Sequence, residues 1–432
     1  MTRSCFALAL ALTAGFWLAT PSVGQHPDGP CAGVTGTPDE FNSQIGQLRL
    51  RVDSLRAAPG ESSKPEIAQR EAQIAELVFK HECARTDLDP DPVRGLGQPQ
   101  PQWITVSTYY GTNRKPVGAT GAITRYGADR EGGDAIRYGQ VRVSIPTRRK
   151  AGELNLPLDL WVFEMPADPS KHFVIRSVAP LAPTAAIQQM QTRLGKLSKK
   201  SILLFVHGYN VPFEDAALRT AQLAHDLDFP GMPIFFSWPS LGRPQGYARD
   251  EEMSELSVAS LNRLLDRLSS LGASEIFIVA HSMGNRVVTR ALQERASTGK
   301  PIPTNLKGIL LAAPDINVEI FKEKLAPALA GLGGISRTIY ASSGDAALRA
   351  SSFIHDFKRV GETRDGVLVF DGFDTVDASL AAPVRRGFGH SYVVDSPKVI
   401  RDMQAIMLLK KPAHQRGLAK KGTPPRFYWN IP

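Results

Sequence analysis

From residue 201 onward, near-continuous apolar runs of strand length alternate with segments that have the apolar spacing of amphipathic helices. Strands that are apolar on both faces are typical of parallel sheets, which helices cover on either side. The pattern predicts an α/β fold, a mostly parallel sheet with helices on both faces. The apolar runs are SILLFVHG, MPIFFSWPS, EIFIVAHSMG, LKGILLAAPD, RTIYASSGD and VLVFDGF, and the helices are expected near 213–227, 248–271, 285–295, 318–325, 346–357 and 398–409.

The residues before this region follow other patterns. Short β-branched and aromatic runs predict the opening strands of the sheet and an edge layer, followed by a helix near 185–197. Apolar residues at helical spacing over 38–57 and 65–86 predict an N-terminal helical hairpin. The expected organisation is a signal peptide at 1–24, the hairpin and a linker at 25–102, the α/β domain at 103–409 and a loosely ordered basic tail at 410–432; the opening strands are ITVSTYYGT, YGQVRVSIP, LDLWVFEMP and FVIRSVAP.

The first residues have the features of a secretory signal peptide. Arg3 supplies a positive charge, the mainly apolar run from Cys5 to Ala19 is too short to span a bilayer comfortably, and Ser22 and Gly24 fit a cleavage site. The protein is therefore expected to be exported, to the periplasm or outside the cell. Cleavage would remove Cys5 and leave Cys31 and Cys83, which predicts one disulfide, two free thiols being the alternative.

Charge adds little to this picture. The formal net charge is +9 over 432 residues, but Lys and Arg are spread along the chain, which favours a solvated basic surface over a nucleic-acid site. Neither Cys31 nor Cys83 lies in a metal-binding or redox motif, and the sequence predicts no cofactor.

The most informative motif is Ala280-His281-Ser282-Met283-Gly284, which joins an apolar strand directly to a helical segment. A nucleophile elbow requires this context, with small residues two positions before and after the nucleophile so that strand and helix can approach. Ala280 and Gly284 meet that requirement. Ser282 is therefore the predicted nucleophile, and an ordinary turn with a serine cap is the alternative.

An elbow serine needs amides that stabilise the oxyanion of the tetrahedral intermediate. The amide of Met283 is one expected donor, and the loop after SILLFVHG should supply the second, from Tyr209 or, failing that, Asn210. His207 in this loop is expected to be structural rather than a base. Trp238 either lines the substrate pocket or packs beneath the loop, and residues 241–255 are a weaker candidate for a lid.

The serine also needs a histidine base, and in this type of site the acid and the histidine follow the serine in the chain. His390 is the predicted base, because it lies in the Gly-flanked loop RGFGHSY after the last expected strand. His355 falls in a helical pattern and His414 in the basic tail, which makes both weaker candidates.

The predicted acid is Asp345, which ends the run RTIYASSGD and precedes a helix. Asp315, Asp371 and Asp374 are rival candidates for this role, and each could instead be a helix cap or turn residue.

Several segments together, namely FVHGYNVPFEDA, FFSWPS, IVAHSMGNR, IYASSGDAAL and GHSY, resemble a bacterial α/β-hydrolase family of unknown function whose members are described as esterase- or lipase-like. The resemblance covers roughly Ile104 to Met407. It implies the same triad of Ser282, Asp345 and His390, and it implies ester hydrolysis without naming a substrate.

The sequence thus predicts a serine hydrolase that cleaves carboxylic esters through an acyl-enzyme. A small or lipid-like ester is the expected substrate, with peripheral membrane contact and no nucleic acid among the partners. Two competing hypotheses are a thioesterase, amidase or peptidase with the same triad, and a non-catalytic binding protein of the cell envelope.

Overall fold

The computed structural model describes residues 102–121, 123–154, 159–160, 163–164, 168–381 and 390–432, together with single positions between 40 and 77. The chain forms two compact units, Met1–Leu96 and Gly97–Pro432. In the first unit the described positions are all helical and fall within the two predicted helices, and Arg51 Nε lies 3.6 Å from Glu66 Oε1. The predicted signal peptide and the Cys31–Cys83 disulfide lie outside the described residues. Within the described part of the chain, no helix is both long enough and apolar enough to cross a bilayer.

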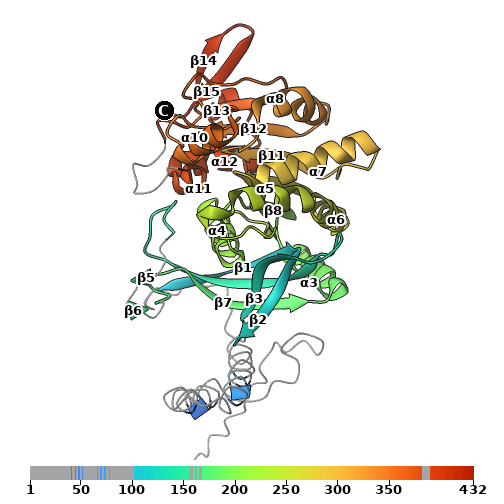
Figure 1. Ribbon diagram of the computed structural model, residues 1–432, viewed down its shortest axis with the longest axis vertical. Coiled ribbons are helices and arrows are strands. Elements are labelled where there is room, and N and C mark those ends of the chain that lie inside the picture. Colours follow the sequence, from blue (N-terminus) through green and yellow to red (C-terminus); the bar gives the residue numbers. More distant parts are fainter. Residues whose placement is uncertain are drawn as a thin grey trace, which may run out of the picture. The chain divides into compact units, whose positions relative to one another are not determined.

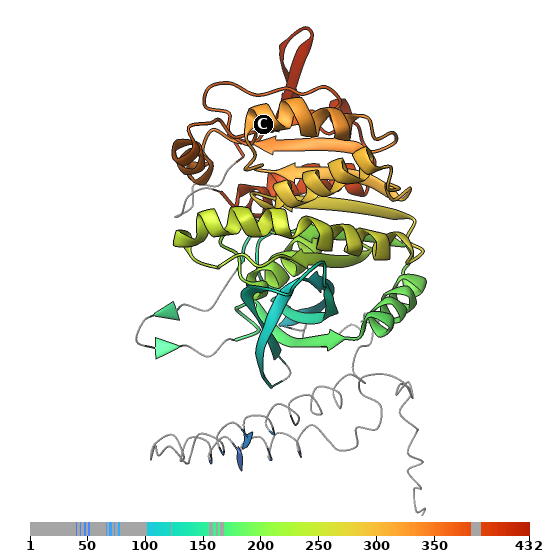
Figure 2. The same cartoon turned by 45° about the vertical axis from the view of Figure 1, so that its right-hand side comes forward.

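The second unit is built on one sheet of 13 strands, and Figures 1 and 2 show its helices on both faces. The strand order is β14-β15-β13-β12-β11-β10-β8-β9-β1-β4-β7-β3-β2. All neighbours from β1 through β9, β8 and β10–β13 to β15 are parallel, which confirms the predicted mostly parallel sheet. The strands are β1 (Trp103–Thr112), β2 (Arg114–Thr120), β3 (Ile123–Arg130), β4 (Arg137–Pro146), β7 (Val174–Leu181), β8 (Ser201–Val206), β9 (Met232–Ser237), β10 (Glu275–His281), β11 (Leu306–Ala312), β12 (Ser336–Ala341), β13 (Asp374–Asp377), β14 (Ala419–Thr423) and β15 (Arg426–Asn430).

The two faces of the sheet carry separate apolar cores. Alternate residues of β8 point to opposite sides: Leu204 joins the core under α3, α6 and α7, whereas Leu203 joins the core under α4 and α12. This two-sided burial explains why the central strands read as continuous apolar runs. The helices are α3 (Pro183–Lys196), α4 (Phe213–Asp226), α5 (Tyr247–Leu256), α6 (Val258–Ser269), α7 (Gly284–Thr298), α8 (Val318–Ile320), α9 (Ala326–Ala330), α10 (Ala346–His355), α11 (Tyr392–Asp395) and α12 (Pro397–Met407), with short turns η2 (Pro244–Gly246), η3 (Phe321–Leu325) and η4 (Ala413–Gln415).

Two predicted elements differ in the structure. The long helix expected over 248–271 is broken at Ser257 into α5 and α6, where the Ser257 hydroxyl donates to the carbonyl of Met253 at 2.6 Å and so competes with the backbone. The run LDLWVFEMP forms β5 (Asp159–Leu160) and β6 (Phe163–Glu164), a separate two-stranded ladder rather than part of the main sheet.

The run VLVFDGF, the last of the six apolar runs, is not a strand. The strand β13 begins only after it, at Asp374. Its phenylalanines act as anchors for a loop: the rings of Phe370 and Phe373 lie 4.7 and 5.5 Å from the ring of Phe321. An apolar run can therefore be buried by side-chain packing alone, without a ladder of backbone hydrogen bonds.

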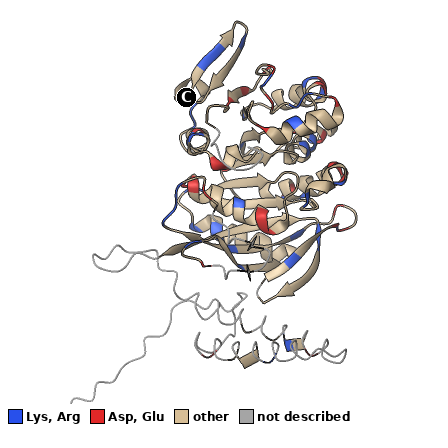
Figure 3. Ribbon diagram, turned by 60° about the vertical axis from the view of Figure 1, so that its left-hand side comes forward, with Lys and Arg blue, Asp and Glu red and all other residues tan. Residues whose placement is uncertain are grey.

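The prediction that residues 410–432 form a loosely ordered tail is also wrong, because β15 pairs in parallel with β13, with Trp429 opposite Val376. Arg416, whose side chain is 1% exposed, anchors this segment between Asp402 and Asp374. Basic and acidic residues are interspersed over the elements of the second unit rather than gathered on one of them (Figure 3).

Candidate active site

Ser282 occupies a tight turn between β10 and α7. Its φ angle is 53°, in the left-handed region that costs a side chain conformational energy. Backbone and side-chain hydrogen bonds hold this conformation: the Ser282 amide donates to the carbonyl of Ala312 at 2.9 Å, and Asn285 Nδ2 donates to the carbonyl of Ser282 at 2.8 Å. The geometry is that of the predicted nucleophile elbow rather than of an ordinary turn.

Two glycines allow the chain to close around this turn. A Cβ on Gly284 would lie 2.3 Å from the carbonyl oxygen of His207, so only glycine lets α7 approach β8 so closely. A Cβ on Gly208 would lie 2.5 Å from Cβ of Ser282 and 3.2 Å from its hydroxyl oxygen. The loop after β8 therefore lies directly against Ser282.

The amides of this loop are not equivalent. The Asn210 amide donates to Oδ2 of Asp250 at 3.3 Å and is turned away from the serine. Within the described residues, the amides of Tyr209 and Met283 donate to no protein acceptor. Both remain available to a ligand oxygen, and both were the predicted oxyanion donors.

Buried polar contacts hold the loop in place. His207 stacks on Trp238 with 5.1 Å between ring centroids, and the Trp238 indole donates to the carbonyl of His207 at 2.7 Å. Trp238 is fully buried, so it packs beneath the loop, and the expectation that it lines a pocket fails for this reason. Arg114, 1% exposed, donates to the carbonyl of Val211 at 2.8 Å and to that of Ser240 at 3.0 Å. No pattern in the sequence pointed to a role for Arg114.

Asp345 and His390 meet at the end of β12. Oδ1 of Asp345 caps α10 by accepting from the Leu348 amide at 3.0 Å, and Oδ2 lies 2.7 Å from Nδ1 of His390. Burial lowers the pKa of His390, but the charge and hydrogen bond of Asp345 outweigh this effect and raise that pKa above its usual value. With Nδ1 held by the carboxylate, Nε2 is the ring nitrogen left for proton transfer.

His390 is also tied to the elbow. Nε2 of His281 lies 3.1 Å from the carbonyl oxygen of His390, and the two rings are 4.8 Å apart. Burial, with a smaller contribution from His390, lowers the pKa of His281 to about 3, so this ring is neutral and can donate. The structure thus ties His390 to His281, the residue before Ser282, although among the described residues the serine hydroxyl makes no hydrogen bond, to the imidazole or to any other group.

The rival acid Asp315 belongs to a different network. Its carboxylate accepts from Tyr247 at 2.6 Å and lies 3.3 Å from Nε of Arg359 and 3.8 Å from Nη2 of Arg286. Burial raises its pKa, but the two arginines and the hydrogen bonds outweigh burial and lower it. The amide of Asp315 lies 3.3 Å from the carbonyl oxygen of Ser282, and its charge adds a smaller upward effect to the pKa of His390.

The remaining candidate bases and acids, His355, His414, Asp371 and Asp374, lie away from the elbow. Nε2 of His355 is 2.9 Å from Glu251, and His414 contacts Gln415. Asp374 pairs with Arg416 at the far end of the sheet, and Asp371 is exposed in a turn. Within the described residues, no cluster of His, Cys, Asp and Glu is suited to holding a metal ion.

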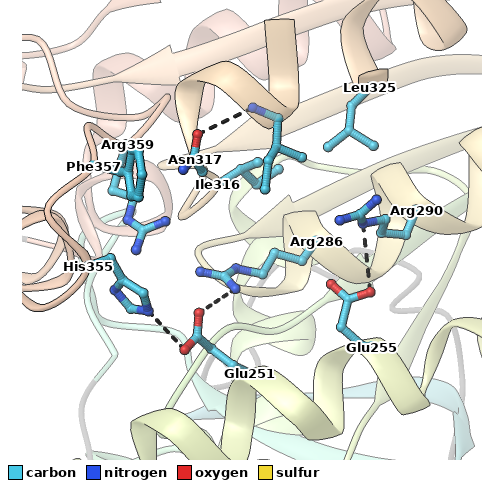
Figure 4. Close-up of a pocket in the computed structure, with 11 residues that line it drawn as sticks. Glu251, Glu255, Arg286, Arg290, Ile316, Asn317, Leu325, His355, Phe357 and Arg359 are labelled. Carbon is cyan, nitrogen blue, oxygen red and sulfur yellow. Dashed lines mark hydrogen bonds and ion pairs between the residues drawn. The ribbon is translucent and has the colours of Figure 1, made fainter. Parts of the chain in front are cut away.

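A cavity of about 260 Å³ opens between α5, α7 and the end of α10 (Figure 4). Glu251 bridges Arg286 at 2.5 Å and His355 at 2.9 Å across it, while Ile316 and Phe357 supply apolar walls. The ring of Tyr247 lies 5.4 Å from the ring of His355, which lines the cavity, and 5.1 Å from the ring of Tyr209. The sequence did not reveal this cavity, because its walls come from segments far apart in the chain.

The mostly parallel sheet, the strained serine between β10 and α7, and the loop packed against it define the class of α/β hydrolases. The sequence model of a family described as "Alpha/beta hydrolase of unknown function (DUF900)" matches residues 182–410, more than half of the chain. The chain belongs to this family.

Among curated proteins, the chain is similar to the uncharacterized protein YnbC of Escherichia coli (strain K12), with 26% identity over 169 residues, 38% of this chain and 26% of that protein. It is also similar to the uncharacterized protein alr1448 of Nostoc sp. (strain PCC 7120), with 28% identity over 127 residues, 23% of this chain and 33% of that protein. The chain thus spans a third or less of the length of these relatives.

Among solved structures, the chain is similar to lipase B of Aspergillus fumigatus, with a TM-score of 0.32, 14% identity and coverage of 53% of this chain and 57% of that chain. Another is an esterase of the archaeon Pyrobaculum calidifontis, with a TM-score of 0.29, 11% identity and coverage of 62% and 80%.

Proposed function

We propose that this hydrolase is a serine esterase in which Ser282 is the nucleophile, His390 the base and Asp345 the acid. The observation that carries the proposal is the 2.7 Å contact between Asp345 and Nδ1 of His390, in a segment tied to the elbow of Ser282. A carboxylate in this position orients the imidazole and stabilises its protonated form during the reaction.

The proposed reaction has two steps. Nε2 of His390 takes the proton of Ser282 as Oγ attacks the ester carbonyl carbon, and the amides of Met283 and Tyr209 hold the resulting oxyanion. The carbon–oxygen bond to the alcohol breaks, and His390 donates the proton to the leaving oxygen. Water then gives a proton to His390 and attacks the acyl carbon; as the bond from that carbon to Oγ breaks, His390 returns the proton to Oγ, which releases the acid and regenerates Ser282.

This reaction requires the imidazole to move within hydrogen-bonding distance of the Ser282 hydroxyl. Contacts of this kind are often long in free enzymes and tighten when substrate binds. No residue in the proposed steps calls for a metal or cofactor.

The test is labelling by a fluorophosphonate probe, followed by hydrolysis of p-nitrophenyl esters of several chain lengths. Ser282→Ala should abolish both signals, because the proposed covalent intermediate forms on Oγ of Ser282. Ser269→Ala, which changes an exposed serine of α6, is the matched control. Equal labelling of wild type and Ser282→Ala would favour a non-catalytic binding protein instead. Thioester and peptide substrates in the same panel separate the esterase from the other triad hydrolases.

We further propose that the protein is exported and does not bind nucleic acid. Export is supported by the charged and apolar pattern of residues 1–24, and the absence of nucleic-acid binding by the dispersed basic residues. Fractionation of cells producing the chain with and without residues 1–24 tests export. Salt-dependent retention on DNA would contradict the second expectation.

A further inference from the structure

His281 belongs to the elbow motif, but the proposed reaction gives it no role. It is the last residue of β10, and alternate side chains of a strand point to opposite faces of the sheet. Val279 lies in the core under α4 and α12, so His281, two positions later, points to the same face. The chain just after His390 packs on this face too, since Tyr392 and Val393 belong to the same core. The fold therefore places His281 against the segment that carries the proposed base.

The contact between the two histidines runs from a side chain to a main-chain group. Nε2 of His281 lies 3.1 Å from the carbonyl oxygen of His390. A carbonyl oxygen can only accept, so Nε2 of His281 carries the hydrogen and donates it. Among the described residues, no other donor reaches this carbonyl. The chain beyond is anchored separately, because Gln222 of α4 donates to the carbonyl of Val394 at 3.0 Å.

The protonation of His281 suits a donor of this kind. Its pKa is about 3, because burial disfavours the charged ring and the neighbouring His390 adds to this effect. The ring is therefore uncharged at any pH at which His390 can act as a base. An uncharged ring, with its centroid 4.8 Å from that of His390, does not repel the imidazolium that His390 becomes during the reaction.

Resting on the proposed esterase function, we propose that His281 is a positioning residue for the base: its Nε2 hydrogen holds the peptide of His390, and through it the imidazole, at the elbow of Ser282. Asp345 fixes the ring of His390 from the side chain, whereas His281 fixes the backbone from which that ring extends. A displacement of about 1 Å in a catalytic group can lower a rate on the order of 10²-fold, so both constraints matter for turnover.

Three substitutions of His281 separate a donor from a packing group. His281→Gln keeps an N–H at nearly the reach of Nε2, His281→Asn carries the same amide on a shorter side chain, and His281→Leu has no donor. On a soluble p-nitrophenyl ester, the glutamine variant should keep kcat within about threefold, whereas the other two should lose about 10- to 100-fold in kcat with little change in KM. The comparison of glutamine with asparagine remains decisive even where the leucine variant folds poorly. His225→Leu, which changes a histidine of similar exposure in the last turn of α4, is the control and should keep the wild-type kcat.

A double-mutant cycle with His390 tests whether His281 acts through the base. The residual hydrolysis of His390→Ala depends on binding and on the oxyanion donors, so His281→Leu should cause no further loss in that background. An equal loss in both backgrounds, a leucine variant with wild-type kcat, or a glutamine variant as slow as the leucine variant overturns the proposal. A wild type that neither reacts with the fluorophosphonate probe nor hydrolyses esters overturns the esterase function itself, so the two failures give different results.

Discussion

At the scale of single residues, the site depends on how Asp345 sets the protonation of His390. Burial alone would keep the imidazole neutral, but the adjacent carboxylate raises its pKa above that of a free histidine. A general base must be neutral before it accepts a proton. The activity of the free enzyme, kcat/KM, should therefore fall as pH drops through this raised pKa, at a higher pH than an isolated histidine would give.

Asp345→Asn should change this profile in two ways. The plateau should fall roughly 10⁴-fold, because the amide neither holds the required tautomer nor stabilises the imidazolium. The acidic limb should move to lower pH, since burial still lowers the pKa of His390 while the larger of the two opposing charges is gone and only the smaller effect of Asp315 remains. The measurement is kcat/KM on a soluble ester between about pH 5 and 9. Asp371→Asn, at an exposed turn, is the control and should leave the profile unchanged; similar effects of both substitutions would refute the role of Asp345.

At the scale of elements, the elbow and the loop after β8 form one rigid assembly. Gly284 lets α7 reach the carbonyls of β8, and Gly208 lets the loop reach Ser282. Arg114 and Trp238 then hold the loop from below, through hydrogen bonds to the carbonyls of Val211 and His207. Rigid placement of this kind keeps amide donors aimed at the developing oxyanion without reorganisation during the reaction.

Gly208→Ala should damage catalysis more than stability. The added Cβ would sit 2.5 Å from Cβ of Ser282, so the loop must move and carry the Tyr209 amide with it. A misplaced oxyanion donor should lower kcat on the order of 10²- to 10³-fold, with a smaller effect on KM. Steady-state kinetics and thermal unfolding measure the two effects separately. Gly195→Ala on α3, where no atom lies within 4 Å of the new Cβ, should leave kcat unchanged; a normal kcat for Gly208→Ala would contradict the assigned role of the loop.

The elements also show which features the sequence can predict. Ser282 and Asp345 could be predicted because each follows an apolar run, and the ends of parallel strands meet at one edge of the sheet. His390 could be predicted only from its order in the chain and its Gly-flanked loop. The orientation of α10 could not be predicted, because periodicity reveals two faces of a helix but not which one is buried. Here the inward face combines Leu348 with the polar Ser351, which donates to Asp315, a residue distant in the sequence.

At the scale of the whole molecule, the last residues of the chain complete the sheet. The segment KKGTPPRFYWN combines charged residues, two prolines and three adjacent aromatic residues, so it shows no alternation of apolar and polar positions that would predict strands. Tertiary contacts order it instead: β15 pairs with β13, and Arg416 inserts beside Asp402, which is 4% exposed and also accepts from Tyr340 at 2.6 Å. The C-terminal segment therefore contributes to the stability of the hydrolase unit.

Arg416→Ala should destabilise the protein by about 3–5 kcal/mol at neutral pH, because Asp402 would be left as a buried charge without its counter-ion. Burial already raises the pKa of Asp402, and loss of the opposing influence of Arg416 would raise it further. A carboxyl whose pKa is higher in the folded state than in the unfolded state destabilises the fold above that pKa and ceases to do so once it is protonated. The deficit measured by denaturant unfolding should therefore be largest near pH 7 and shrink toward pH 5. Arg426→Ala, at an exposed position of the same hairpin, should cost little at either pH, and a deficit that did not depend on pH would place the effect of Arg416 in packing rather than in charge.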